Sequence, residues 1–175
     1  EKVITVDHEV LKNFTNEPYT KALTAVINNE KPAIVLVGAT SIGRDIAPRV
    51  SARIHTGLTA DCTSLDIDDE TRNLMMTRPA FGGNIMATII CPDHRPQMST
   101  VRPGVMLKLE RNTSNTGDVI DFDADLNAQD LNVEVLEIVK EDHKKVNIED
   151  AKVLVSAGRG IGSKENMSPL YDLAD

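Results

Sequence analysis

Two glycine-rich turns that follow apolar runs are the segments of this 175-residue sequence best suited to hold a ligand. The turn GATSIG occupies residues 38–43 after the apolar run 33–37, and the turn GRGIG occupies residues 158–162 after the run 152–156. Glycines let backbone amides approach a ligand closely, and the N-terminus of a following helix offers free N–H groups to an anion. Either turn could cradle a phosphate or a polarised carbonyl, although many parallel α/β proteins carry such turns with no ligand.

Arg159 is the side chain of the second turn that could bind a ligand. The turn almost fits the dinucleotide motif G-x-G-x-x-G, but Ser163 stands where the last glycine is required, which disfavours a hydride-transfer site. An arginine between Gly158 and Gly160 could reach a phosphate or the edge of a flavin ring with its planar set of donors. The alternative is a surface arginine with no partner.

A third candidate is the segment RPAFGGN at residues 78–84, which we expect to be a loop between two strands. It combines a guanidinium, a flat aromatic ring, two glycines and an amide. Phe81 could pack on a planar heterocycle, and Arg78 or Asn84 could bond its polar edge. The alternative is that Phe81 belongs to the core and that the glycines only form a turn.

The residue patterns that many enzymes use for catalysis are absent. There is no Gly-x-Ser-x-Gly elbow, no H-E-x-x-H motif and no Walker A motif. His94 could be a general base, and Asp61 with Cys62 could be half of a thiol site, but neither has an identifiable partner. A solvated loop histidine and a buried cysteine fit them better. We therefore expect no catalytic residue and no metal site in this chain.

Composition narrows the class of protein further. The net charge of -8 disfavours nucleic acids and anionic membranes as partners, because it repels phosphate groups. No apolar run approaches the roughly 18 residues that span a membrane. The two cysteines, Cys62 and Cys91, lie in apolar segments and form no C-x-x-C pair, which is typical of buried thiols in a reducing cytosol. We therefore expect a cytoplasmic protein.

The order of the apolar patterns predicts an α/β fold, with a mainly parallel sheet and flanking helices. Residues 33–37 form a continuous apolar run, which is typical of a strand buried on both faces. Pro48 fits the helix after residue 43 only if that helix begins just before it. Residues 112–130 are expected to be a surface excursion, and Ser163 is a candidate N-cap. The other expected helices cover residues 18–29 and 164–175, and the other expected strands cover 2–6, 74–77, 85–91, 99–102, 105–109, 133–139 and 152–156.

Five motifs in this order resemble the alpha subunit of electron transfer flavoproteins. They are GATSIGRDIAPR at 38–49, TGLTADCT at 56–63, TRPAFGGN at 77–84, TVRPG at 100–104 and SAGRGIG at 156–162. The similarity runs through nearly the whole chain. The run HRPQM at 94–98 looks like the NADH-linked, electron-bifurcating forms of anaerobic bacteria.

The resemblance implies an alpha/beta heterodimer that carries electrons through FAD. Residues 1–148 would be part of a nucleotide-hydrolase-like N-terminal α/β domain that packs on the beta subunit, and residues 149–175 would open a flavodoxin-like FAD domain. The resemblance assigns Arg159, beside Gly160, to that FAD. It places the 78–84 loop, with Thr40, Arg44 and Arg102, on the side that faces the beta subunit and its nucleotide, which is a second FAD or AMP.

The same resemblance implies partners and a boundary. The redox partners would be a dehydrogenase such as an acyl-CoA dehydrogenase, and NADH and ferredoxin in the bifurcating forms. The protein would be an electron carrier or part of an electron-bifurcating oxidoreductase complex. The family's first two βα units are expected to precede residue 1, and most of the FAD domain to follow residue 175.

Two other functions remain open on the residues alone. One is a nucleotide-binding α/β domain without flavin, which would use residues 38–44. The other is a structural partner domain, whose glycines are only turns.

Overall fold

The computed structural model describes residues 2–139, 148 and 151–174. Contacts divide the chain into two units, Glu1–Val135 and Leu136–Asp175. We describe each unit by itself.

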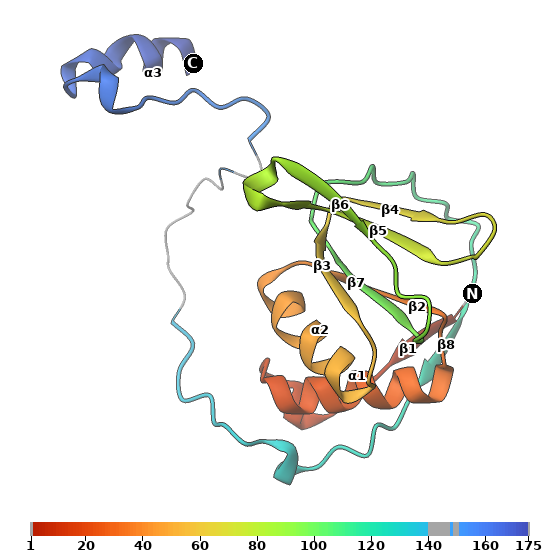
Figure 1. The fold of residues 1–175 in the computed structure, drawn as a ribbon. Helices are drawn as coiled ribbons and strands as arrows, with labels where there is room; N and C mark the ends of the chain where they lie inside the picture. The colour runs from red at the N-terminus through yellow and green to blue at the C-terminus, as the bar shows by residue number, and fades with distance from the viewer. Residues whose placement is uncertain (1, 140–147, 149–150, 175) are drawn as a thin grey trace. The chain divides into compact units, whose positions relative to one another are not determined.

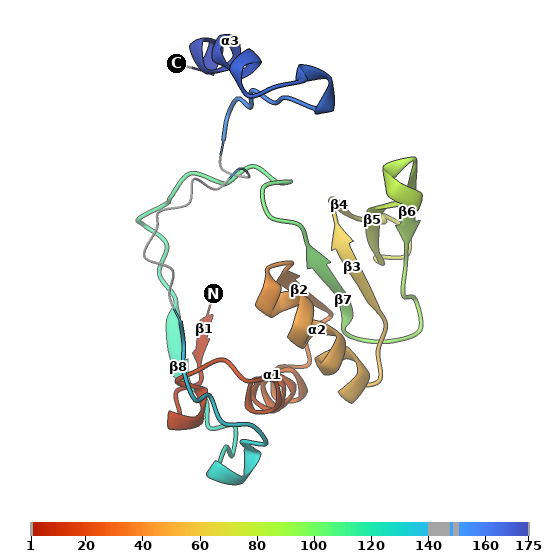
Figure 2. The same ribbon diagram turned by 90° about the vertical axis from the view of Figure 1, so that its left-hand side faces the viewer.

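A three-stranded parallel sheet forms the centre of the first unit, in the order β2-β7-β3. Helix α2 lies across one face of it, and α1 packs against α2 (Figures 1 and 2). Ile27 of α1, Val50 of α2 and Met98 of β7 share one core cluster. The elements are β2 (Ile34–Gly38), β7 (Gln97–Val101), β3 (Leu58–Cys62), α1 (Asn16–Glu30) and α2 (Ser41–Arg53).

The central strand of this sheet is β7, and β2 is an edge strand. Leu36 in β2 is 53% exposed, so the prediction that this strand is buried on both faces is wrong for the residues described. Residues 97–100 of β7 are buried even though three of them carry hydroxyl or amide groups. Gln97 is satisfied there because its Oε1 accepts a 2.8 Å hydrogen bond from the backbone N of Leu74.

Helix α2 begins earlier than the sequence predicts. It starts at Ser41, and Pro48 lies inside it. A proline at this position cannot donate the hydrogen bond to the carbonyl of Arg44. The helix nevertheless continues, because Ile46, Ala47 and Val50 are buried against the sheet. Packing of the apolar face therefore outweighs the local cost of the proline.

A second, antiparallel sheet follows in the chain, with the order β4-β5-β6 (Figure 2). Leu74 and Met76 of its middle strand bury against Cys62. The loop predicted at 78–84 is shorter in the structure, because its first three residues continue β5 and pair with β6. Cys62 is buried as expected, but Cys91 is only half-buried. The elements are β4 (Ser64–Ile67), β5 (Leu74–Ala80), the 3-10 turn η2 (Phe81–Gly83) and β6 (Ile85–Ile89).

Part of the predicted surface excursion is a strand. Residues 118–121 form β8, which pairs in parallel with β1 at the start of the chain. Ala124 and Leu126 then bury against Val10 and Ala22. Residues 105–109 and 133–139, predicted as strands, adopt no regular structure. The elements are β1 (Lys2–Thr5), β8 (Asp118–Asp121) and the 3-10 turns η1 (Glu9–Leu11) and η3 (Ala128–Asp130).

The second unit contains short helical turns. The strand predicted at 152–156 is absent from the described part of this unit, and no residue described there is buried. A strand needs a hydrogen-bonding neighbour, and the described residues of this unit offer none. The helix predicted at 164–175 is divided, and Lys164 rather than Ser163 occupies the cap position of its first turn. The elements are η5 (Arg159–Ile161), η6 (Glu165–Met167) and α3 (Ser168–Ala174).

Candidate functional site

The carboxyl ends of the three parallel strands meet at one edge of the sheet. The backbone N of Ala39, just after β2, donates to the carbonyl of Val101 at 2.7 Å. The backbone N of Arg102, just after β7, donates to the carbonyl of Cys62 in β3 at 2.9 Å. In open α/β sheets this edge is where ligands bind. The three connections therefore bring the turn after β2, Arg102 and the end of β3 into one place.

Asp61 is the centre of this edge. Its Oδ1 accepts hydrogen bonds from Nη2 of Arg44 and Nε of Arg102, each at 3.1 Å, and its Oδ2 accepts one from Nη2 of Arg102 at 2.6 Å. Arg102 thus grips the carboxylate with two donors. The hydrogen bond from Arg102 holds the pKa of Asp61 below its ordinary value, and the charges of Arg102, Arg44 and Arg78 act in the same direction.

We call Arg44, Arg78 and Arg102 around Asp61 the arginine cluster. Arg44 is also anchored by its Nε, which donates to the carbonyl of Ala39 at 2.9 Å. The Nε of Arg78 is buried, with no hydrogen-bond partner among the residues described. Three guanidinium charges and one carboxylate leave a surplus of two positive charges in a chain whose net charge is -8. Such a set of donors suits a phosphate or the electron-rich edge of a flavin ring.

The glycine-rich turn after β2 is built by close backbone approach. A Cβ at Gly43 would lie 1.9 Å from the carbonyl oxygen of Gly38, so only glycine fits there. Thr40 is the N-cap of α2, and its Oγ1 accepts a 3.1 Å hydrogen bond from the backbone N of Gly43. The sequence predicts that Thr40 binds a ligand. In the structure its side chain caps α2 at this junction.

Phe81 and Asn84 lie at the far end of the β5–β6 hairpin. The side chain of Phe81 is 81% exposed, so it does not belong to the core. Phe81, Gly82 and Gly83 all have positive φ angles, 49°, 69° and 91°, which make a tight turn. No hydrogen bond among the described residues joins this turn to Asp61. The structure thus brings Arg44 and Arg102 onto one carboxylate, whose pKa the charge of Arg78 also lowers. It leaves Phe81 and Asn84 at the exposed tip.

Arg159 and Gly160 lie in the 3-10 turn of the second unit, and both are exposed. A Cβ built on Gly158 or Gly160 would meet nothing within 4 Å. The described residues of this unit therefore do not explain these two glycines by packing, and the backbone is open to a ligand. Gly162 has a φ of 81°, which explains the glycine there.

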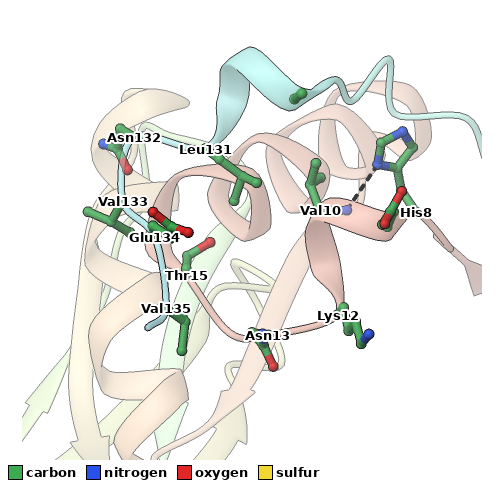
Figure 3. Close-up of a pocket in the computed structure, with 12 residues that line it drawn as sticks. His8, Val10, Lys12, Asn13, Thr15, Leu131, Asn132, Val133, Glu134 and Val135 are labelled. Atoms are coloured by element: carbon green, nitrogen blue, oxygen red, sulfur yellow. Dashed lines mark hydrogen bonds between the residues drawn. The ribbon is translucent and has the colours of Figure 1, made fainter. Parts of the chain in front are cut away.

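A groove of about 760 Å³ lies elsewhere in the first unit (Figure 3). It is lined by η1, the segment between η1 and α1, and residues from 128 to 135, and no predicted site residue lies in it. His8 on its wall accepts a 3.3 Å hydrogen bond at Nδ1 from the backbone N of Val10. Among the residues described, no helix is long and apolar enough to cross a membrane. No group of three or more His, Cys, Asp or Glu side chains in the same part of the chain could hold a metal ion.

Comparison with known proteins identifies the family. A family model described as the electron transfer flavoprotein domain matches residues 1–127. The chain belongs to the electron transfer flavoprotein family. The resemblance drawn from five motifs and the α/β fold class are thereby confirmed, and membership implies a flavin as the family's cofactor.

Relatives in this family are similar along nearly the whole chain. The electron transfer flavoprotein subunit alpha of Thermoanaerobacterium thermosaccharolyticum is 54% identical over 99% of this chain and 52% of its own length. Protein FixB of Azotobacter vinelandii is 42% identical over 99% of the chain and 49% of its own length. The lactate dehydrogenase (NAD(+),ferredoxin) subunit LctC of Acetobacterium woodii is 41% identical over 100% of this chain and 41% of its own length. The chain thus spans about half the length of the electron transfer flavoproteins that it matches.

Sequence reasoning did not select Asp61 as a site residue. It considered Asp61 only as a neighbour of Cys62 in a thiol site. The available signal was that Asp61 is the one acidic residue in the motif TGLTADCT, while the motifs before and after it each carry arginine.

Proposed function

We propose that this chain is part of the alpha subunit of a heterodimeric electron transfer flavoprotein. The whole protein would carry electrons through FAD between NADH or acyl-CoA-type dehydrogenases and their redox partners, including electron bifurcation to ferredoxin. We place it in the bacterial cytoplasm. Residues 1–148 would pack on the beta subunit, and residues 149–175 would begin the FAD domain of the alpha subunit.

The observation that carries this proposal is the arginine cluster at the carboxyl edge of the parallel sheet. A member of this family needs positive charge where a flavin nucleotide approaches. Arg44 and Arg102 are held at that edge by Asp61, and their side chains are 55% and 42% exposed. The unpaired Nε of Arg78 adds a donor that lacks a partner among the described residues. The donor set therefore fits the nucleotide of the beta subunit, which is a second FAD or AMP.

The chain's own residues would act by binding and by electrostatics. Bound FAD supplies the redox chemistry. Guanidinium groups near its polar edge would donate hydrogen bonds and favour negative charge on the ring, which raises the reduction potential. Arg159 would do this for the FAD of the alpha subunit, and Gly160 would let the backbone come close. The cluster of Arg44, Arg78 and Arg102 would act on the nucleotide of the beta subunit.

The tip of the β5–β6 hairpin would meet the beta subunit. Phe81, Ile85 and Met86 are 81%, 53% and 56% exposed, an apolar group on the β5–β6 hairpin. Aromatic side chains of this kind anchor many protein interfaces. Asn84 at the same tip would supply a polar contact beside the ring.

The first experiment is to purify the full-length alpha and beta subunits together and to count their flavins. Two FAD per heterodimer support the bifurcating form, and one FAD plus AMP supports the simple carrier. A colourless complex would contradict the proposal and favour the nucleotide-binding domain without flavin.

Arg159→Ala tests the second unit within that complex. The substitution should lower the midpoint potential of the alpha-subunit FAD or reduce FAD content, because a positive charge beside the ring is lost. Lys152→Ala, which removes an exposed cation from the same unit, is the control. Unchanged redox titration and FAD content in Arg159→Ala would remove that role.

Phe81→Ala tests the hairpin. It should weaken association with the beta subunit at least about tenfold, since aromatic anchors commonly contribute ~2 kcal/mol. Leu107→Ala removes another exposed apolar side chain, 96% exposed and outside the hairpin, and should leave association unchanged. If the two variants associate equally well, as judged by analytical ultracentrifugation, the hairpin is not the docking element.

A further inference from the structure

We propose that Asp61 is a positioning residue, which holds Arg44 and Arg102 in the orientation that binds the beta-subunit nucleotide. This inference rests on the proposed function, because it concerns the same edge of the sheet. It assigns the acidic residue a role distinct from neutralising its neighbours.

Several constraints meet at the carboxylate of Asp61. Arg102 uses Nε and Nη2 on both oxygens of Asp61, so the plane of its guanidinium is fixed by two points. Arg44 uses Nη2 on Asp61 and Nε on the carbonyl of Ala39, so it too is fixed by two points. Among the described residues, no group accepts from Nη1 of either arginine. Each therefore keeps one donor group for a ligand after its orientation is set.

The backbone of Asp61 also sets the direction of its side chain. The pairing of β3 with β7 shifts register between Thr59 and Cys62, so Asp61 lies in an irregularity of the strand. Its φ is 61°, a left-handed conformation that aspartate tolerates better than most residues. Its backbone N donates a 2.8 Å hydrogen bond to Oγ1 of Thr100, which is 1% exposed. The irregularity aims the carboxylate between the arginines, and a buried hydroxyl holds it there.

Removing the charge of Asp61 distinguishes a positioning role from a neutralising one. If Asp61 only reduced the positive charge, its removal would raise the surplus from two charges to three, and an anionic nucleotide would bind more tightly. If Asp61 orients the donors, its removal frees both guanidinium groups, and binding weakens because the donors must be ordered again on binding. The two roles therefore predict opposite changes in the same dissociation constant.

The test uses the full-length alpha–beta heterodimer, stripped of bound nucleotides and titrated with FAD and, separately, with AMP. Arg102→Ala first shows which binding step of the titration depends on the arginine cluster. We call this step the cluster-dependent component. Asp61→Asn should then weaken that component roughly tenfold, the effect of losing about one charge-assisted hydrogen bond. In the Arg102→Ala background, Asp61→Asn should add less than about twofold, because the arginine through which it mainly acts is gone.

A second variant leaves every charge in place. Thr100→Val removes only the hydroxyl that holds the Asp61 backbone, and it should weaken the same component severalfold. Circular dichroism and thermal unfolding of each heterodimer show whether the variant is folded. If Asp61→Asn does not fold, Thr100→Val decides the test.

The outcomes are distinguishable. Tighter or unchanged nucleotide binding in folded Asp61→Asn overturns the positioning role and leaves the proposed function standing. An additive loss in the double variant also overturns it. If Arg102→Ala alters no component, the nucleotide site at this edge is wrong, and the inference about Asp61 falls with it.

Discussion

The close approach at Gly43 makes a quantitative prediction about the junction that positions the arginine cluster. In Gly43→Ala the new Cβ would lie 1.9 Å from the carbonyl oxygen of Gly38 and 3.1 Å from Cγ1 of Val37. Carbon and carbonyl oxygen normally approach to about 3.3 Å, so the start of α2 must move by about 1.4 Å. Such a movement breaks the hydrogen bond from the backbone N of Gly43 to Thr40.

Two effects of this substitution oppose each other. Alanine is favoured over glycine inside a helix by about 1 kcal/mol. Overpacking costs about 1–3 kcal/mol, and here the obstacle is backbone rather than a flexible side chain, so the upper end applies. Loss of the Thr40 cap adds about 1 kcal/mol. The net destabilisation is therefore about 2–3 kcal/mol, which lowers Tm by roughly 5–10 °C in a unit of this size.

Thermal unfolding followed by circular dichroism measures this change. Gly38→Ala is the matched control at the same junction, because its Cβ would meet only Cγ2 of Thr40, at an ordinary 3.9 Å. The control should unfold within about 1–2 °C of the wild type. If Gly43→Ala unfolds at the wild-type temperature, the junction is not held by close backbone approach, and the reasoning is refuted.

Two further predictions concern the helix α1 and its neighbours. Thr20 is 0% exposed, and its Oγ1 has no partner among the described residues. Thr20→Val should therefore raise the free energy of unfolding by about 1 kcal/mol, measured as a higher midpoint of urea unfolding. Lower stability in Thr20→Val would show that the hydroxyl has a partner. The hydrogen bond from Lys21 lowers the pKa of Asp130. Its stabilising effect is therefore present above the unfolded pKa of about 4 and is lost as pH falls through the lower folded value. Hydrogen exchange of residues 122–126 should accelerate over that interval, and Asp130→Asn should remove the change; equal pH dependence in both proteins would contradict the assignment.

The local strand-turn-helix unit and the family could be predicted from sequence. The apolar run before residue 38, the glycines and the helical spacing of Ile46 and Val50 are local patterns, so they identify β2, the turn and α2. The five motifs that carry the family resemblance are also contiguous. They required no knowledge of which segments touch. The family model covers the first four motifs, and the relatives are similar over nearly the whole chain, including the fifth.

Other features depend on contacts between distant segments. β8 is a strand only because β1, more than a hundred residues earlier, pairs with it. The segment at 152–156 resembles a strand in composition, but it has no pairing neighbour among the residues described. Pro48 is tolerated in α2 because the sheet covers the helix around it. In each case the presence or absence of a remote partner overrides the local preference.

The amino-acid sequence by itself determined the glycine turns, the arginines and the family of this protein, because these are properties of short contiguous segments. Only the tertiary structure decided that Asp61 gathers Arg44 and Arg102. Arg44 lies in the first turn of α2, Asp61 near the end of β3 and Arg102 just after β7. Parallel strand pairing brings the ends of β2, β7 and β3 to one edge. Their hydrogen bonds span 17 and 41 residues of sequence, a separation that no local pattern encodes.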